Sequence, residues 1–394
     1  MKASMILSVA LVGLLITGER VGADDPPRRG PRPGDFPRRG PRPEGPPRRM
    51  PRPEPPPYRV LRPANRPPGI AERALAPDSS PDSGPLPRGT PTVTPIMRAA
   101  LNTERGPHNE GNIYAPEVLF EGDQFRMYYG AQGKDGHDRI HLAVSPDGEK
   151  WVRRGVVVGN DEANHVNDPS VVRVGGTYFM FYTRAVVDVT DDIAMATSQD
   201  GVHWNKQGPV LRPGAAGEWD SLCVGRPSVL YEGNMFRMWY DGRKDLPLDA
   251  PGNVPKSATS TRLAGYAASP DGIHWTKHTH PVFDHGAGGV DVKKINDVYV
   301  MAYESAEGTQ VATSPDGIWN WAAKGLWVPL SGRDFDRYGQ VTPMIFAGPR
   351  GRVETLFIGA ATAASWDRNM IARVHLTPAQ LAQVASPSAQ ASNP

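Results

Sequence analysis

Cysteine is almost absent from the sequence: the 394 residues include only one, Cys223. A single thiol excludes an internal disulfide, so the folded part must draw its stability from its core alone. The residues beside Cys223 offer no base that could activate the thiol, which argues against thiol catalysis. We therefore expect Cys223 to be a small buried residue.

Long apolar runs are missing beyond the N-terminus. Within residues 1–23, Lys2 precedes an apolar stretch from Met5 to Thr17 that is too short to span a bilayer comfortably, and small residues follow up to Ala23. We predict a signal peptide over residues 1–23, with an uncleaved anchor as the alternative. The protein is then exported to the periplasm, the cell envelope or the medium, without a transmembrane span.

Common catalytic motifs are missing as well. The sequence has no Gly-rich phosphate loop, no His-Glu-x-x-His, no paired cysteines and no Gly-x-Ser-x-Gly elbow. His108 and His165 are isolated polar candidates. We expect no metal and no cofactor, although the sequence leaves open a calcium ion in the centre of the fold.

Proline and arginine, by contrast, are abundant between residues 24 and 94. Residues 24–75 hold 13 arginines against six acidic residues, in a loosely repeated Pro-Arg-Arg-Gly-Pro-Arg-Pro unit. Such a segment cannot bury enough apolar surface to fold and stays extended. We predict a disordered linker that is either a plain spacer or a tether to an acidic polymer of the cell envelope. It lacks interleaved aromatic residues, so nucleic acid is not an expected partner.

A short motif recurs in the remaining sequence, and repeats of this kind are a strong indication of fold. Ser-x-Asp-Gly followed by Trp occurs four times, beginning at Ser145, Ser198, Ser269 and Ser314. Asp-Gly is typical of hairpin turns because glycine accepts a positive φ without steric cost. We interpret the motif as structural, with its Trp packed between neighbouring repeats.

Five pairs of strand-like runs accompany these turns, each pair joined by a Gly- or Asn-containing turn. They begin at Pro116, Pro169, Pro227, Val292 and Pro343. With the strands around the Asp-Gly turns they give four strands per repeat. The pattern predicts an all-β fold, a five-bladed β-propeller of four-stranded blades over residues 95–376, and a disordered tail over residues 377–394. A β-sandwich is the alternative, but it gives no reason for the repeated turn.

The first strand of each propeller blade lines the central channel, so the residue before the repeated proline should lie at one rim. These rim residues are Ala115, Asp168, Arg226, Asp291 and Thr342. The second strand returns to the same face, where three blades end on polar residues. Carboxylates that converge in a partly dry pocket repel one another, which separates their pKa values as acid–base chemistry requires.

From these positions we predict three catalytic residues, Asp168, Asp291 and Glu304. The predicted substrate-binding residues are those expected at the same open end, or mouth, of the central channel: Glu117, Arg226, Asp241, Arg184, Arg243 and Trp366. The Trp could stack on the apolar face of a sugar. Asp220 and Asp336 each lie seven residues before a repeated proline and follow an aromatic residue, so we interpret them as loop caps.

The segment from Asn167 to Thr183, Asn-Asp-Pro-Ser-Val-Val-Arg followed by Gly-Thr-Tyr-Phe-Met-Phe-Tyr-Thr, resembles the blade motif of five-bladed glycosidases. These are arabinanase-, levansucrase- and invertase-like proteins, including glycoside hydrolase families 43 and 32. In family 43 the general base is an Asp before Pro in blade one, a second Asp in blade two tunes the site, and a Glu in blade three is the acid. Asp168 matches the second Asp, whereas Ala115 and Gly225 stand where the base and the acid are expected.

The resemblance implies hydrolysis of an extracellular poly- or oligosaccharide, with Glu117, Asp291 or Glu304 replacing the missing carboxylates. The alternative is a non-catalytic carbohydrate-binding or scaffold propeller that the Pro/Arg-rich segment tethers to the envelope. A pair of carboxylates within about 10 Å of each other across a pocket favours the enzyme. In either case we expect a monomer whose partner is a carbohydrate.

Overall fold

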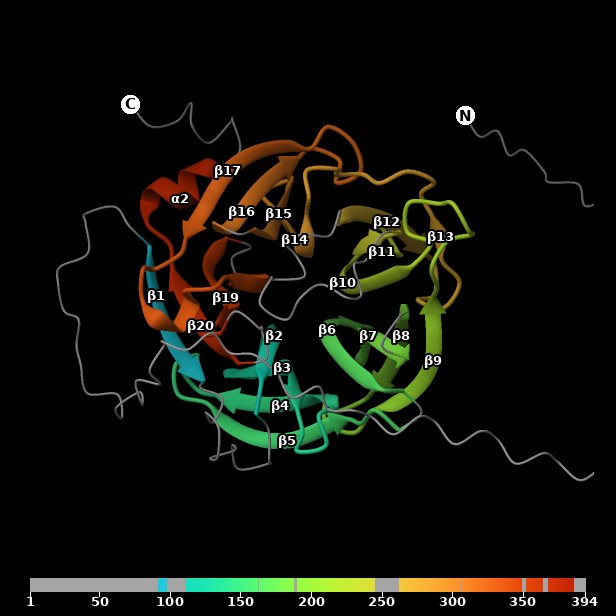
Figure 1. Cartoon of the computed structure of the whole chain (residues 1–394), viewed down its shortest axis with the longest axis horizontal. Coiled ribbons are helices and arrows are strands. Elements are labelled where there is room, and N and C mark those ends of the chain that lie inside the picture. Colours follow the sequence, from blue (N-terminus) through green and yellow to red (C-terminus); the bar gives the residue numbers. More distant parts are fainter. Residues whose placement is uncertain are drawn as a thin grey trace, which may run out of the picture. The chain divides into compact units, whose positions relative to one another are not determined.

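The computed structural model describes residues 91–97, 111–161, 163–187, 190–244, 262–305, 307–348, 352–363 and 368–385. They all belong to the second of two units of the chain, Asp82–Pro394. They form five sheets of four strands around a common centre (Figure 1). The predicted five-bladed β-propeller is therefore confirmed, and a β-sandwich is excluded. The predicted signal peptide and nearly all of the Pro/Arg-rich segment lie outside the described residues.

The first three blades each consist of four strands that are consecutive in the sequence and antiparallel to their neighbours. The first blade contains β2 (Ile113–Glu121), β3 (Gln124–Gln132), β4 (Asp138–Ser145) and β5 (Val152–Val158). The second contains β6 (His165–Val174), β7 (Thr177–Val187), β8 (Thr190–Ser198) and β9 (Asn205–Leu211). The third contains β10 (Cys223–Glu232), β11 (Met235–Arg243), β12 (Leu263–Ser269) and β13 (Thr276–Lys277).

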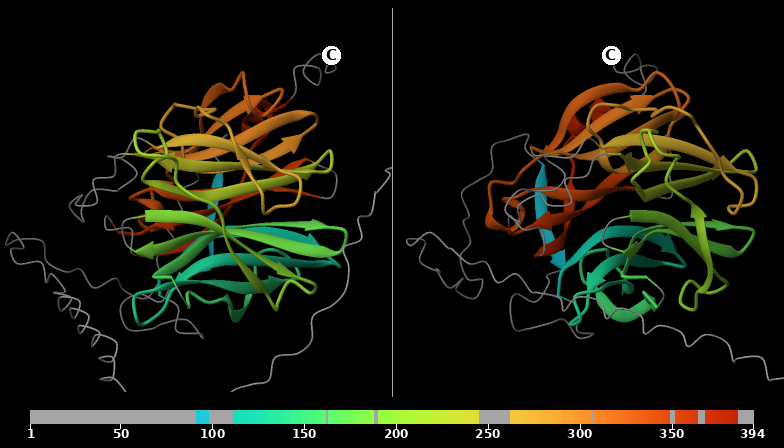
Figure 2. Two further views of the ribbon diagram at one scale, coloured as in Figure 1. Left: turned by 90° about the vertical axis from the view of Figure 1, so that its right-hand side faces the viewer. Right: turned by 45° about the vertical axis from the view of Figure 1, so that its right-hand side comes forward.

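The fifth blade closes the ring with a strand from the other end of the unit. The fourth blade contains β14 (Gly288–Ile295), β15 (Val298–Ser305), β16 (Gly308–Ser314) and β17 (Ala322–Pro329), and a 3₁₀ turn, η1 (Asp334–Asp336), follows. The fifth contains β18 (Gln340–Ala347), β19 (Val353–Ala361), β20 (Asn369–His375) and, as its outer strand, β1 (Thr92–Met97). The propeller thus begins at Thr92, slightly before the predicted residue 95. Figure 2 shows the twisted blades from the side.

The repeated Asp-Gly turns have the structural role predicted for them. In the first, the Ser145 hydroxyl accepts a hydrogen bond from the backbone N–H of Gly148 at 2.8 Å and donates one to Asp147 at 2.9 Å. Gly148 has a φ of 71°, which side chains other than glycine rarely adopt. Trp151 packs edge-on against Phe357 of the preceding blade. The motif therefore shapes the hairpin and joins neighbouring blades.

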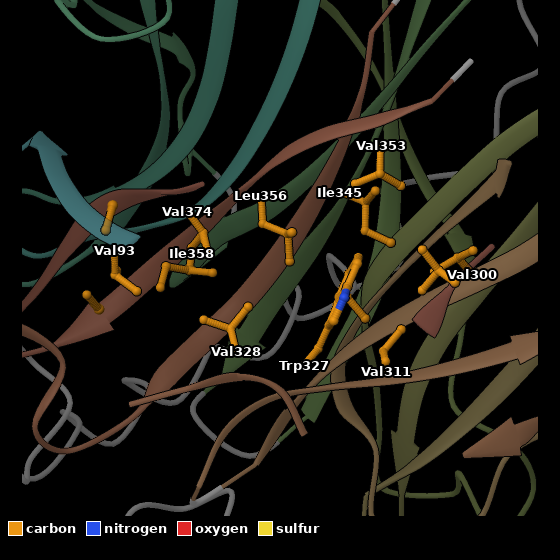
Figure 3. Packing of buried hydrophobic residues seen from close by; sticks show 14 of the residues in the cluster. Val93, Val300, Val311, Trp327, Val328, Ile345, Val353, Leu356, Ile358 and Val374 are labelled. Atoms are coloured by element: carbon orange, nitrogen blue, oxygen red, sulfur yellow. The ribbon is translucent and has the colours of Figure 1, made fainter. Parts of the chain in front are cut away.

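Apolar side chains between the blades form the core, and the cluster between the fourth and fifth blades is shown in Figure 3. It includes Val300 of β15, Leu356 of β19 and the fully buried Trp327 of β17. Burial of such side chains contributes about 1.5–3 kcal/mol each. This packing between sheets replaces the disulfides that the sequence lacks.

The C-terminal segment continues the fold further than expected. Helix α2 (Pro378–Gln383) begins with a capping box between Thr377 and Gln380, and it covers the indole of Trp327, whose N–H donates to the Gln380 carbonyl at 2.9 Å. Val384 is buried in the same core. The prediction of a disordered tail from residue 377 is therefore wrong for residues 377–384, because their apolar contacts with the last two blades were not visible as a repeat. Within the described residues, no helix is long and apolar enough to cross a membrane.

Candidate functional site

All five inner strands share one irregularity, and it forms the rim of the channel. Each strand shifts its register against its neighbour at a residue with a positive φ of 45–54°. These residues are Ala115, Asp168, Arg226, Gly289 and Thr342. All five line one cavity at the centre of the propeller, with about 320 Å³ of empty space including its open mouth. Because every blade has this bulge, it is a property of the fold and not by itself a sign of function.

In the fourth blade the predicted rim residue was wrong by two positions. Gly289, not Asp291, has the positive φ of the rim, and Gly288 pairs with Glu304 as Asn167 pairs with Thr183. The reason is that this blade lacks the proline that marks the bulge elsewhere. Asp291 instead lies one step deeper in the channel, although it still lines the cavity.

Asp168 is the predicted catalytic residue with the most favourable geometry. It lines the cavity and is only 6% exposed, and its Oδ1 has no hydrogen-bond partner within the described part of the chain. Its other oxygen lies 4.0 Å from Nε of Arg226. Burial raises the pKa of Asp168, although Arg226 and a hydrogen bond from Thr183 oppose the shift. Asp168 can therefore hold a proton closer to neutral pH than an exposed aspartate does.

Asp241 lies beside Asp168 and is surrounded by arginines. One of its oxygens accepts from Nε of Arg262 at 2.6 Å and lies 3.3 Å from Arg226, while the other is 3.8 Å from Arg243. Burial opposes its ionisation, but the three guanidiniums outweigh burial and hold its pKa well below the usual range. Because Asp168 and Asp241 both contact Arg226, their carboxylates lie within about 10 Å of each other, the range in which two carboxylates can flank a glycosidic bond.

Glu304 stands at the position equivalent to Thr183 and joins two blades. It accepts a hydrogen bond from the backbone N–H of Thr342 at 3.1 Å, as Thr183 accepts one from Arg226 at 2.7 Å, and it is also paired with Arg262. A side chain engaged in this way is poorly placed to exchange protons with a substrate. The geometry therefore favours a structural role over the predicted catalytic one.

Asp291 belongs to a second set of contacts between blades, deeper in the channel. It accepts from the backbone N–H of Ile345 at 2.7 Å, from Ser228 at 2.9 Å and from Lys293 at 2.8 Å. Glu117 occupies the equivalent position in the first blade and accepts a longer bond, 3.4 Å, from the next blade. Burial raises the pKa of Glu117 to about 7, although Lys293 opposes the shift. These two carboxylates hold the inner strands together.

The structure does not place the remaining predicted residues at the cavity. Arg184 makes a two-pronged ion pair with Asp192 of the neighbouring strand, at 2.8 and 2.7 Å, and is absent from the cavity lining. Trp366 and His108 lie outside the described residues. The cap interpretation agrees with the contacts of Asp220, which accepts from Tyr240 and Lys277, and of Asp336, which accepts from Ser331 and Gln340.

Sequence reasoning missed a partly buried hydrogen-bond network beside Asp168. The Tyr114 hydroxyl donates to Asp138 at 2.7 Å and accepts from the Asn167 amide at 2.7 Å. Nδ1 of His165 accepts from the backbone N–H of Asp138 at 3.0 Å. Burial, with Asp138 and Asp168 nearby, raises the pKa of Tyr114 well above its usual value. Tyr114 and Asn167 precede rim residues, a signal that was available, whereas nothing in the repeat marks Asp138.

Asp191 was also missed, because nothing in the repeat marks its position. It lies near the start of β8, and burial raises its pKa, with a further rise from Asp168 and Asp241 that Arg243 and Arg226 oppose. When two carboxyl groups lie close together, the charge of one disfavours ionisation of the other. One of them then stays protonated while the other is ionised. The charge of Asp168 contributes to the raised pKa of Asp191 in this way.

A metal site is not evident in the described residues, where no group of three His, Cys, Asp or Glu side chains stands close enough to hold an ion. In the channel, the ammonium of Lys293 donates to Asp291 at 2.8 Å and opposes the effect of burial on the pKa of Glu117.

Comparison with known proteins now adds to this geometry. A family model described as β-1,4-mannooligosaccharide phosphorylase, glycoside hydrolase family 130, matches residues 92–213, which contain β1 and the first two blades. An uncharacterised protein of Mycobacterium tuberculosis is 28% identical over 282 residues, covering 62% of this chain and 86% of the relative. A β-1,2-mannobiose phosphorylase of Thermoanaerobacter sp. is 32% identical over 110 residues, 25% of this chain and 35% of that protein.

Solved structures show the same fold. A glycoside hydrolase superposes with a TM-score of 0.58 and 21% identity, covering 72% of this chain and 92% of that one. A member of the family 130 mannoside phosphorylases and hydrolases, described as targeting β-1,2 mannosidic linkages in Candida mannan, gives a TM-score of 0.51 and 14% identity, covering 75% and 95%. The predicted kinship and the expected class of enzyme, one acting on glycosidic bonds of oligosaccharides, are supported by these findings. The chain thus has the five-bladed β-propeller fold of these glycosidases, and residues 92–213 are similar to a glycoside hydrolase family.

Proposed function

We propose that the protein cleaves a glycosidic bond of an oligosaccharide at the mouth of the channel. The observation that carries the proposal is Asp168, a buried carboxyl group that lines the central cavity and has one oxygen without a hydrogen-bond partner among the described residues. Asp168 donates a proton to the leaving oxygen, as a carboxyl group with a raised pKa can at working pH. Asp191, in the ionised form, accepts a proton from the attacking water. Asp241 stays ionised and holds the arginines in place.

We propose water rather than phosphate as the attacking group. Phosphorolysis is the second candidate, because the matching family is described as a phosphorylase and three arginines lie at the mouth. However, Arg226, Arg243 and Arg262 face four carboxylates. These are Asp168, Asp191, Asp241 and Glu304. A phosphate dianion needs a surplus of positive charge, and the described residues at the mouth provide none.

The first substrates to test follow from the names of the relatives. They are β-1,4-mannooligosaccharides and β-1,2-mannobiose, followed by a wider panel of plant and algal glycans. Export, a monomeric state and attachment of the Pro/Arg-rich segment to an acidic envelope polymer remain proposals. Secretion of a tagged full-length chain and its mass in solution test the first two, and pull-down of wall polymers tests the third.

The decisive experiment incubates the purified protein with each glycan, with and without inorganic phosphate. Release of free reducing sugar without phosphate supports hydrolysis, whereas sugar 1-phosphate formed only with phosphate supports phosphorolysis. The matched control is Asp168→Asn, which should lower the rate of either reaction by about 10²–10⁴-fold and leave the fold intact. Tight binding of a glycan without cleavage would instead establish the non-catalytic carbohydrate-binding propeller.

A further inference from the structure

Buried polar atoms without partners gather at the channel mouth. Within the described residues, Oδ1 of Asp168, Oδ1 of Asp241, Nε of Arg226 and Nε of Arg243 are buried and make no hydrogen bond. Three of the residues are buried, with Asp168 and Arg243 each 6% exposed and Asp241 1%, whereas the side chain of Arg226 is partly exposed. Such atoms are rare in folded proteins and call for water or a ligand.

These four residues alternate in chemistry along a continuous row. Asp168 lies 4.0 Å from Arg226, Arg226 lies 3.3 Å from Asp241, and Asp241 lies 3.8 Å from Arg243. The first and last distances are too long for hydrogen bonds. Each of these two pairs also has one unpartnered carboxylate oxygen and one unpartnered guanidinium nitrogen: Oδ1 of Asp168 with Nε of Arg226, and Oδ1 of Asp241 with Nε of Arg243. The row therefore contains two pairs in which a free hydrogen-bond acceptor lies beside a free donor, Asp168 with Arg226 and Asp241 with Arg243.

A hydroxyl group satisfies such a pair, because it donates one hydrogen bond and accepts others. A phosphate or carboxylate group only accepts, so it would satisfy the guanidinium and be repelled by the aspartate. An ammonium group only donates, so it would satisfy the aspartate and be repelled by the guanidinium. A second charge of either sign also disturbs a cluster in which guanidiniums and carboxylates already balance closely.

Resting on the proposed function, we propose that the mouth is a subsite selective for an uncharged sugar ring. Asp168 and Arg226, which line the cavity, bind a hydroxyl group of that ring between them. Asp241 and Arg243 do not line the cavity themselves, but with Arg262 they balance the charge around Arg226 and leave no surplus there. Sugars that carry a carboxylate, phosphate or ammonium group are excluded.

The test is binding to the wild-type full-length chain, measured by saturation-transfer NMR with titration. Mannose, glucose and galactose are each compared with their uronic acid, 6-phosphate and 2-amino counterparts at neutral pH and at two salt concentrations. We expect saturable binding of at least one neutral hexose, and at least tenfold weaker binding of its three charged counterparts. Equal or tighter binding of a charged counterpart, or no binding of any neutral hexose, overturns the proposal.

Charge variants sharpen the test. Arg226→Gln removes one positive charge from a half-buried position and should shift the preference towards the 2-amino sugar. Asp241→Asn should shift it towards the uronic acid and the 6-phosphate; if this variant does not fold, Arg226→Gln carries the test alone. Arg173→Gln is the matched control, since Arg173 is half exposed and paired with Glu121 away from the cavity, and its selectivity should match the wild type.

The subsite and the glycosidase proposal can fail separately, because binding is scored without turnover. Selective binding of a neutral hexose by a protein that cleaves no glycan would retain the subsite and refute catalysis. Cleavage of a neutral glycan together with equal binding of charged sugars would retain catalysis and refute the selectivity.

Discussion

Replacement of Asp168 by asparagine is the most direct test of the site. Asn is nearly isosteric with Asp and tolerates the left-handed backbone that the rim requires, where Asp168 has a φ of 50°. The change removes the proton that Asp168 is proposed to donate. Loss of a positioned acid or base lowers rates by about 10²–10⁴-fold, so we expect that decrease in kcat on any glycan that the protein cleaves.

The stability of the Asp168→Asn variant should change little, for two opposing reasons. Burial raises the pKa of the Asp168 carboxyl group, so its ionisation destabilises the folded state as pH rises. The asparagine cannot ionise, and this destabilisation is lost. The substitution also removes a 4.0 Å contact with Arg226, which keeps Asp241 as a closer partner at 3.3 Å. At 4.0 Å this contact is too long for a hydrogen bond, and its loss opposes the gain from removing the buried charge, so the melting temperature should stay within about 3 °C of the wild type.

A turn aspartate provides the matched control. Asp200 accepts from the backbone N–H groups of Val202 and His203 at 2.8 Å each, in an exposed hairpin. Asp200→Ala should therefore lower the melting temperature and leave kcat near the wild-type value. Thermal melts by circular dichroism and initial rates on the same preparations separate the two roles. Full activity of Asp168→Asn on a substrate that the parent cleaves would remove Asp168 from the site and refute the mechanism.

Three further predictions concern the fold. Burial raises the pKa of Glu117 from 4.5 to about 7, so its ionisation should cost the fold on the order of 3 kcal/mol as pH rises through that window, and Glu117→Gln should flatten the fall in melting temperature. An unchanged pH profile contradicts this. Gly317→Ala should destabilise more than Gly325→Ala in thermal melts, because both have a positive φ but only at Gly317 would the new methyl group approach Trp239, at 2.9 Å. The buried Cys223 should resist a thiol reagent until the protein unfolds, and rapid labelling of the native protein would refute its burial.

The fold was predictable because the repeats carry local signals that agree with one another. The Asp-Gly turns begin at Ser145 and its three equivalents, and each lies between strands with β-branched and aromatic residues. What failed depended on contacts between distant segments. The outer strand of the fifth blade, Thr92–Met97, and helix α2, Pro378–Gln383, both pack on blades far away in the sequence, and no turn motif marks either one.

The site was only partly predictable, because its charges pair across blades. Reading the rim from the repeated proline located Asp168 and Arg226, which both line the cavity. It misplaced Asp291, since the fourth blade has Val290 in place of the proline. It could not locate Arg262, which follows a segment outside the described residues and contacts Asp241 and Glu304 of two different blades.

The site is best recognised where the propeller departs from its own repeat. One position on the second strand of each blade faces the rim: Thr183 and Glu304 use it to accept a backbone N–H of the following blade. Asp241 occupies the equivalent position in the third blade, yet it directs its oxygens to Arg262, Arg226 and Arg243. A buried charge cluster costs desolvation energy that a simple backbone hydrogen bond would avoid. This cluster lies beside Asp168, whose Oδ1 has no hydrogen-bond partner among the described residues, so this arc of the ring is where a substrate should be sought.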